Sequence, residues 1–234
     1  FNTFQKLIDK QHPLYPKLER QFDGLRASVA HICLYIGLKK SSQELQLPTS
    51  NFWIFPGYDH DKTVREYLAN PEEKPFPVVY ISFPSAKDPD WVNRYPGTST
   101  IEIISLAPYE WFKNWEDTRW GKRGEDYNAM KEKWSLRLLE KLYSQLPHLR
   151  GQIDYYELST PLSTKNFTGY QSGEIYGLEH SPERFRNEHL TPHTPFKNLY
   201  LTGQDIVSCG IGGALMSGLI TSSAILKKNL IKSI

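Results

Sequence analysis

The residues best suited to chemistry gather near the C-terminus, where a glycine cluster follows an acidic residue. The segment from Asn198 to Leu226 reads NLYLTGQDIVSCGIGGALMSGLITSSAIL, and Asp205 comes just after its first apolar stretch. The glycine cluster, GIGG at 210–213, opens a predicted helix. The start of a helix leaves backbone N–H groups unpaired and carries partial positive charge, and glycine lets a ligand approach the backbone closely. Such a place suits phosphate oxygens or a flavin carbonyl, and an acidic side chain beside it suits a sugar hydroxyl.

Simpler interpretations of this segment compete with a ligand site. The run 206–226 holds no charged residue and is long enough to span a bilayer, and the spacing of Ala214 and Gly218 resembles a contact between membrane helices. A plain buried helix with glycines for close packing is a second alternative. The acidic residue and the glycines at one end favour a ligand site. A P-loop is excluded because no GxxxxGK[ST] motif is present.

Hydrophobic patterns elsewhere predict the elements that must hold this segment in place. Strands are predicted at 28–38, 51–55, 77–83, 99–106, 152–158 and 198–202. Helices are predicted at 61–68, 108–115, 126–146 and 211–226, and a short helix or turn at 12–22. Asp61 is the expected N-cap of the helix at 61–68. Interleaved strands and helices indicate an α+β or α/β fold.

The composition excludes several classes of protein. The chain has 28 Lys and Arg against 26 Asp and Glu, and this net charge of +2 argues against a nucleic-acid binder. With 39% hydrophobic and 23% charged residues, the chain is not a disordered one. Its two cysteines, Cys33 and Cys209, cannot form a disulfide framework and have no zinc-site spacing. We therefore expect no metal site.

Aromatic residues are unusually frequent, at 13% of the chain. Two clusters of them are candidates for the lining of a tunnel for a long apolar ligand. They comprise Phe52, Trp53, Phe55, Tyr58, Tyr109, Trp111, Phe112, Trp115 and Trp120. Packing in the core or at an interface is the competing interpretation, and for each residue taken singly it is the stronger one.

The C-terminal segment resembles the flavin-contacting motif of flavoproteins with two dinucleotide-binding domains, which include amine oxidases, phytoene desaturases and carotenoid isomerases. Within this group, NLYLTGQD, CGIGGAL and SSAILKKNL are most similar to the C-terminus of the retinol saturase family. The resemblance extends upstream over most of the chain. It includes FPSAKDPDW (83–91), RYPGTST (94–100), YEWFKNW (109–115), GKRGEDY (121–127) and IYGLEH (175–180).

The resemblance implies a non-covalently bound FAD, whose reduced form delivers hydride to a polyene double bond while a proton is added to the neighbouring carbon. On the matching positions, Gly203 and Asp205 are expected to contact the ribityl–pyrophosphate part. Five further residues are expected at the flavin ring, with the positive end of the helix facing its pyrimidine side. They are Gly210, Ile211, Gly212, Gly213 and Ala214. Whether NAD(P)H is the electron donor stays open.

The segment GEIYGLEH at 173–180 supplies two candidates for the proton donor. Histidine titrates in the useful pH range, and His180 stands beside Glu179. Tyr176 is the rival donor. The competing interpretations are a surface histidine paired with a glutamate, and an ordinary glycine turn at Gly177.

The resemblance also implies a domain organisation. Residues 1–162 are expected to form a mixed-sheet substrate-binding domain, and residues 163–234 the C-terminal strand–helix segment of the FAD-binding domain. The composition changes near Pro161, in agreement with this division. The N-terminal GxGxxG motif of the family is absent, and the chain begins with Phe1. We therefore expect a piece of a longer protein that lacks the N-terminal Rossmann half, binds FAD weakly or not at all by itself, and is inactive alone.

Several functions stay open at this point. The resemblance favours a flavoenzyme that reduces a carbon–carbon double bond of a retinoid or another polyene. A carotenoid isomerase or desaturase of the same fold is the first alternative, and a truncated, non-catalytic fragment that binds a lipid or a partner chain is the second. Such substrates dissolve in membranes, which indicates a peripheral membrane contact, at the endoplasmic reticulum in a eukaryote or at the cytoplasmic or inner-membrane face in a bacterium.

Overall fold

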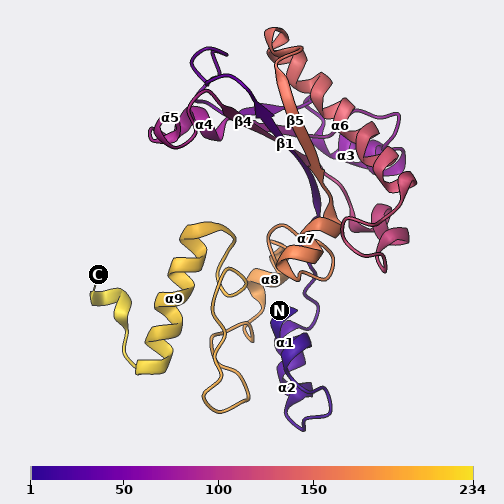
Figure 1. The fold of residues 1–234 in the computed structure, drawn as a ribbon. Coiled ribbons are helices and arrows are strands. Elements are labelled where there is room, and N and C mark those ends of the chain that lie inside the picture. Colours follow the sequence, from indigo (N-terminus) through magenta and orange to yellow (C-terminus); the bar gives the residue numbers. More distant parts are fainter. Residues whose placement is uncertain (1, 234) are drawn as a thin grey trace. The chain divides into compact units, whose positions relative to one another are not determined.

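The computed structural model of the chain describes residues 2–233 and divides into two compact units (Figure 1). The sheet unit comprises Ala30–Phe167, and the terminal unit combines the described residues up to Val29 with those from Thr168 onward. The predicted domains, 1–162 and 163–234, remain a prediction about function. The compact units differ from them by grouping the first 29 residues with the C-terminal part.

The sheet unit is built on a five-stranded sheet with the order β2-β3-β4-β1-β5. Its strands are β1 (His31–Leu38), β2 (Phe52–Ile54), β3 (Val79–Ser82), β4 (Ser99–Leu106) and β5 (Ile153–Ser159). All four pairings are antiparallel, so the expectation of a mixed sheet was wrong. In the strand at 99–106, every second residue is buried in the folded chain. Such alternation is typical of an antiparallel sheet with one covered face.

The covered face of the sheet packs against the long helix α6 (Glu125–Gln145) (Figure 1). Leu138 and Leu142 of this helix are fully buried, together with Ile32 of β1 and Ile101 of β4. Each such side chain stabilises the fold by about 1.5–3 kcal/mol relative to an exposed one. Gly124, with a φ of 97°, precedes the helix, and its last residues lead into a 3₁₀ turn, η3 (Pro147–Leu149).

Helix α3 (His60–Ala69) begins one residue earlier than the predicted range of 61–68. Its N-cap is Asp59, whose Oδ1 accepts a hydrogen bond from Lys62 N at 3.0 Å, so the assignment of the cap to Asp61 was wrong. Asp61 instead lies in the first turn, where its charge still favours the helix. Shorter helices complete the unit: α4 (Pro84–Lys87), α5 (Trp91–Arg94), η2 (Tyr109–Trp115) and α7 (Pro161–Thr168).

The terminal unit has a small core of its own, formed by Leu18, Phe22, Leu178 and Leu201. Its helices are α1 (Asn2–Leu7), α2 (Tyr15–Glu19), η1 (Arg20–Phe22), α8 (Pro182–Arg186), α9 (Gly210–Leu226) and η4 (Leu230–Ser233). Over residues 2–233, none of the helices combines the length and the apolar character needed to cross a membrane.

The strand predicted at 198–202 is not formed, and this prediction was wrong. The segment makes one isolated bridge, between Tyr200 and His193. A strand is stabilised by a ladder of hydrogen bonds along a partner, and an apolar run without such a ladder stays irregular. The segment is held by side chains instead, since Thr221 Oγ1 donates to Leu201 O at 2.8 Å.

Candidate functional site

The two motifs singled out in the sequence meet in the terminal unit. The segment 175–179 runs antiparallel to residues 26–29, with a bridge between Ala27 and Leu178. From the other side, Asp205 Oδ1 accepts a hydrogen bond from Leu178 N at 2.9 Å. The backbone N–H of Cys209 donates to His180 Nε2, also at 2.9 Å. Two hydrogen bonds therefore join the loop that leads into α9 to the segment that carries Tyr176 and His180.

The hydrogen bond between Leu178 and Asp205 requires a glycine at position 177. The φ of Gly177 is +69°, a conformation that residues with a side chain rarely adopt. A Cβ atom at this position would also clash with Oδ1 of Asp205. The glycine in GEIYGLEH thus lets Asp205 reach the backbone of the neighbouring residue, which explains its place in the motif.

The start of α9 is open. The N-cap residue, Cys209, makes no side-chain hydrogen bond to the helix, and the first turn has no acidic residue. A Cβ atom on Gly212 would meet nothing within 4 Å, and Gly210 and Ile211 are exposed. Gly213 differs, because a Cβ atom there would clash with the backbone carbonyl of Ser208. One glycine of the cluster thus allows the loop to pack on the helix, and the others leave the helix start accessible to a ligand.

Helix α9 turns its small residues inward. Gly213, Ser217 and Thr221 are buried, and Ser217 Oγ accepts a hydrogen bond from Gly203 N at 2.7 Å. Large apolar side chains face outward, among them Ile211 at 82% and Leu215 at 71% of full exposure. This is the reverse of the usual arrangement of a surface helix, in which the apolar stripe faces the core.

The two candidate proton donors have different surroundings. Tyr176 is 45% exposed, and its backbone N–H donates to Ser28 Oγ at 3.0 Å. His180 accepts the hydrogen bond of Cys209 through Nε2, and Arg184 Nη1 lies 3.2 Å from its Nδ1. Burial and the Arg184 charge lower the pKa of His180, against the opposing effects of a hydrogen bond with the Leu178 backbone and of the Asp205 carboxylate. A catalytic role for either residue stays a prediction.

Cavities of the terminal unit lie beside the loop 202–206 and beside helix α8. The smaller, of about 360 Å³, is lined by the loop 202–206 together with aromatic side chains of other segments, so two of the expected cofactor contacts, Gly203 and Asp205, line it. Its aromatic walls are Phe4, Phe22, Tyr170 and Tyr200. The glycine cluster of α9 does not contribute to it. The expected cofactor residues therefore fall into two groups, one beside a cavity and one at an exposed helix start.

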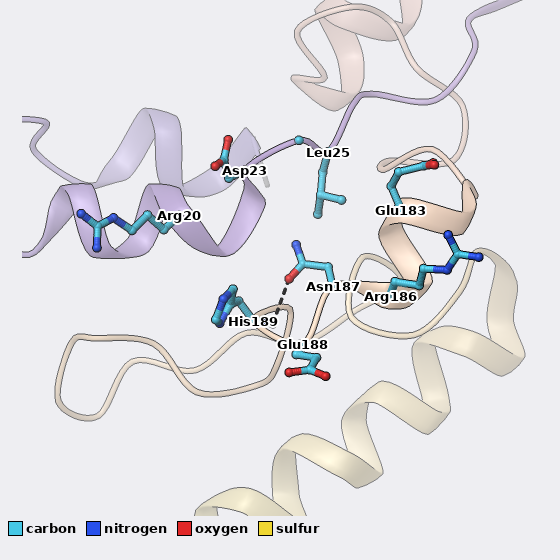
Figure 2. Close-up of a pocket in the computed structure, with 9 residues that line it drawn as sticks. Arg20, Asp23, Leu25, Glu183, Arg186, Asn187, Glu188 and His189 are labelled. Carbon is cyan, nitrogen blue, oxygen red and sulfur yellow. Dashed lines mark hydrogen bonds between the residues drawn. The ribbon is translucent and has the colours of Figure 1, made fainter.

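The larger cavity, of about 550 Å³, contains none of the expected site residues (Figure 2). Charged side chains of both signs surround it, including Arg20 and Asp23 on one side and Glu183 and Arg186 of α8 on another. Asn187 Oδ1 accepts a hydrogen bond from His189 N at 2.8 Å on its wall. Within the part of the chain that the structure describes, no group of three or more metal-binding side chains is found.

Neither of these two cavities includes any of the nine aromatic residues proposed as a tunnel lining. Trp111 stacks on Trp134 of α6 with a centroid distance of 5.8 Å, and Tyr67 meets Trp111 edge-on at 5.4 Å. Phe112 is buried in the same core. Trp53 and Tyr58, by contrast, are 63% and 101% exposed. For Tyr109, Trp111 and Phe112 the competing interpretation, core packing, is confirmed.

Sequence reasoning missed Arg184, which has only 3% of its surface exposed. Nothing in the local pattern marks this residue, because an arginine in a short polar helix normally points to solvent. Its contacts cross 20 or more residues along the chain, so only the folded structure shows them.

Comparison with known proteins adds an independent observation. Over 98% of its length the chain is 36% identical to the all-trans-retinol 13,14-reductase of Danio rerio and 34% identical to that of Rattus norvegicus. It is also 30% identical to a protein of Danio rerio named inactive all-trans-retinol 13,14-reductase. The chain spans 39% of the length of each of these relatives. No family model matches the chain. The resemblance inferred from the motifs is thereby confirmed.

Proposed function

We propose that this chain, a relative of the all-trans-retinol 13,14-reductases over 98% of its length, is the C-terminal part of a flavoprotein that reduces a carbon–carbon double bond of a retinoid. The observation that carries the proposal is the open start of α9. It combines the absence of a side-chain cap with a glycine, Gly212, beside which a Cβ atom would meet nothing. Such a helix start fits the electron-rich edge of a flavin.

The residues of this chain hold FAD in two places under the proposal. Backbone N–H groups of the first turn of α9, from Gly210 to Ala214, face the flavin ring and stabilise negative charge on it. Gly203 and Asp205 face the ribityl–pyrophosphate part from the loop that lines the smaller cavity. FAD in its reduced form supplies the hydride. Tyr176 supplies the proton, because His180 already accepts a hydrogen bond and its pKa is lowered.

The proposal assigns the polyene to the aromatic face of the sheet unit. Trp53 pairs with Tyr80 in register, and their ring centroids lie 4.7 Å apart. Tyr35 and Tyr155 of β1 and β5 are 47% and 62% exposed. These side chains point away from the face that packs on α6, since successive residues of a strand alternate between faces. Aromatic side chains contact a flat, apolar ligand favourably.

The proposal also assigns a partner, the N-terminal FAD-binding half of a longer protein. The outward-facing apolar side chains of α9 support it, because an exposed stripe containing Ile211 and Leu215 gains stability when another apolar surface covers it. The chain spans 39% of the length of these relatives, so more than half of each relative lies outside the matched region, in agreement with such a partner.

A non-catalytic role is the second candidate. One specific observation favours it, the 30% identity with a relative named inactive. A carotenoid isomerase or desaturase reaction uses the same cofactor contacts and differs in whether electrons enter, leave or cycle. The substrate test below separates these possibilities.

The longer protein that contains this chain tests the proposal. Purified with FAD, it is expected to show a flavin absorption spectrum, and all-trans-retinol is expected to reoxidise its reduced flavin without oxygen. Gly212→Ala is expected to weaken FAD binding by about tenfold, the equivalent of 1.4 kcal/mol. Gly218→Ala is the matched control, since a Cβ atom there also meets nothing and the residue lies two turns along the helix. No reoxidation by any polyene would overturn the reductase assignment.

A further inference from the structure

A buried arginine organises the loop that leads into α9. Arg184 is 3% exposed, and its guanidinium donates to backbone carbonyls of two separate segments. Nη1 donates to Leu178 O at 2.7 Å. Nη2 donates to Gln204 O at 2.7 Å, to Asp205 O at 3.2 Å and to Val207 O at 3.4 Å. One side chain thus connects the segment that carries Tyr176 with the loop before α9.

The chemistry of this contact requires an arginine. A buried charge is costly unless hydrogen bonds replace its water shell, and here carbonyl oxygens provide them. The planar fork of the guanidinium presents several N–H groups in fixed directions, so it reaches both segments at once. The compact ammonium group of a lysine carries the same charge and lacks this reach. Asp205 adds a favourable charge, which opposes the effect of burial in lowering the pKa of Arg184.

Side-chain contacts define the conformation of this loop in place of regular secondary structure. Residues 203–209 form no regular helix or strand. Further contacts of these residues include the hydrogen bond from Ile206 N to Gly203 O, the bond from Gln204 Nε2 to the Tyr170 hydroxyl, both at 3.1 Å, and the contacts of Gly203, Asp205 and Cys209 described above. Three carbonyls within this short segment converge on Arg184, so its guanidinium sets the path of the backbone that ends at the start of α9.

We propose that Arg184 is the positioning residue of the flavin-contacting loop: its guanidinium fixes the carbonyls of Gln204, Asp205 and Val207 and so sets the place of the α9 start. Only one part of this proposal rests on the proposed function, namely that the loop contacts a flavin. The fixing of the loop itself is a property of the chain without cofactor. Arg184 acts through the backbone, and the charge that it brings beside His180 is a second, separable effect.

Three variants separate the two effects. Arg184→Gln removes the charge and most of the fork, and Arg184→Lys keeps the charge and removes the fork. Arg186→Gln is the matched control, because this arginine is exposed on the same short helix. The first measurement is hydrogen exchange of the Gly203, Ile206 and Cys209 amides in the chain without FAD. Both Arg184 variants are expected to speed this exchange by about tenfold or more, and the control is expected to leave it unchanged.

The second measurement is the pKa of His180, followed by NMR. It is expected to rise in Arg184→Gln and to stay low in Arg184→Lys, since only the first variant removes the neighbouring positive charge. A general loosening of the unit predicts the same change in both variants. Should Arg184→Gln leave the terminal unit unfolded, Arg184→Lys and the control carry the comparison. Unchanged exchange in both Arg184 variants would overturn the proposal.

The third measurement uses the longer protein and its FAD. Both Arg184 variants are expected to weaken FAD binding by about tenfold. If the unaltered protein binds no FAD while the exchange results hold, the proposed function fails and the role of Arg184 in fixing the loop stands. If the unaltered protein binds FAD and both variants bind it equally well, the positioning role is overturned.

Discussion

His180 Nε2 accepts a hydrogen bond from the backbone N–H of Cys209 at 2.9 Å, which joins the motif at 173–180 to the residue that caps α9. A neutral imidazole has one acceptor nitrogen, and a protonated imidazole has none. The bond therefore exists only while His180 is neutral. This hydrogen bond holds the loop in place and requires an unprotonated Nε2. His180 therefore has no proton at Nε2 to donate to a substrate.

Acid is expected to break the hydrogen bond between Cys209 and His180 and so to lower the stability of the terminal unit. Folding lowers the pKa of His180 below the ordinary histidine value of about 6.5, so the unfolded chain binds the proton more tightly. The stabilising effect is complete well above pH 6.5 and is lost as the pH falls from there through the lower, folded-state pKa. We expect urea unfolding of the terminal unit to show this loss between neutral pH and about pH 5.

The matched variant for this experiment is His180→Asn, because the amide oxygen of asparagine accepts a hydrogen bond and does not titrate in this range. Its stability is expected to change less with pH than that of the unaltered chain. An equal pH dependence in both proteins would show that another group is responsible.

Gly177→Ala is expected to destabilise the terminal unit by more than its backbone conformation alone explains. Gly24 has nearly the same φ, +71° against +69°, and lies in the same unit. A Cβ atom at Gly24 meets nothing within 4 Å, whereas at Gly177 it clashes with Asp205. The left-handed conformation costs about 1–2 kcal/mol for a residue with a side chain, so Gly24→Ala measures that contribution.

The difference between the two glycine variants then reports the contact with Asp205. Chemical denaturation gives both free energies of unfolding, and the Gly177 variant is expected to lose at least about 1 kcal/mol more. Equal losses would contradict the close packing of Gly177 on Asp205.

The neighbouring glycines of α9 are expected to respond in opposite ways. Gly213→Ala forces a Cβ atom against the Ser208 carbonyl, so the loop has to move and stability falls by about 1–3 kcal/mol. Gly212→Ala introduces no contact, and alanine stabilises a helix by up to about 1 kcal/mol relative to glycine. Thermal unfolding of the two variants beside the unaltered chain measures both effects. Similar shifts of Tm in the same direction would show that Gly213 has more room than the structure indicates.

Most of the sheet unit could be predicted from the sequence because local patterns determine it. The strand at 99–106 is rich in β-branched residues, and the helix predicted at 126–146, observed at 125–145, has a clear 3.6-residue period. The strand orientations could not be predicted in the same way, since pairing depends on contacts between segments. The strand predicted at 198–202 failed for a related reason, because an apolar run becomes a strand only beside a partner ladder.

The glycines of the candidate site can be recognised in the sequence, whereas the contacts of its charged residues cannot. Gly177, Gly210 and Gly203 all adopt positive φ angles, which a sequence motif marks clearly. Arg184 and the hydrogen bond of His180 arise from contacts between distant parts of the chain. A sequence pattern offers only residue types for such contacts, and an arginine on a short helix normally indicates a solvated surface.

The two cysteines are expected to differ sharply in reactivity. Cys33 is buried in β1, and burial raises the pKa of its thiol to about 12, so almost no thiolate forms at pH 8. Cys209, in front of α9, is partly exposed. A disulfide reagent such as dithiobis(nitrobenzoate) is expected to modify Cys209 in the folded chain and to reach Cys33 only after unfolding in denaturant. Cys209→Ser is expected to abolish the fast reaction and to leave the slow one in place. In the longer protein, bound FAD is expected to protect Cys209, because the proposed flavin contacts begin at the next residue. Rapid modification of Cys33 without denaturant would show that β1 opens to solvent in the native protein and would contradict its place in the interior of the sheet.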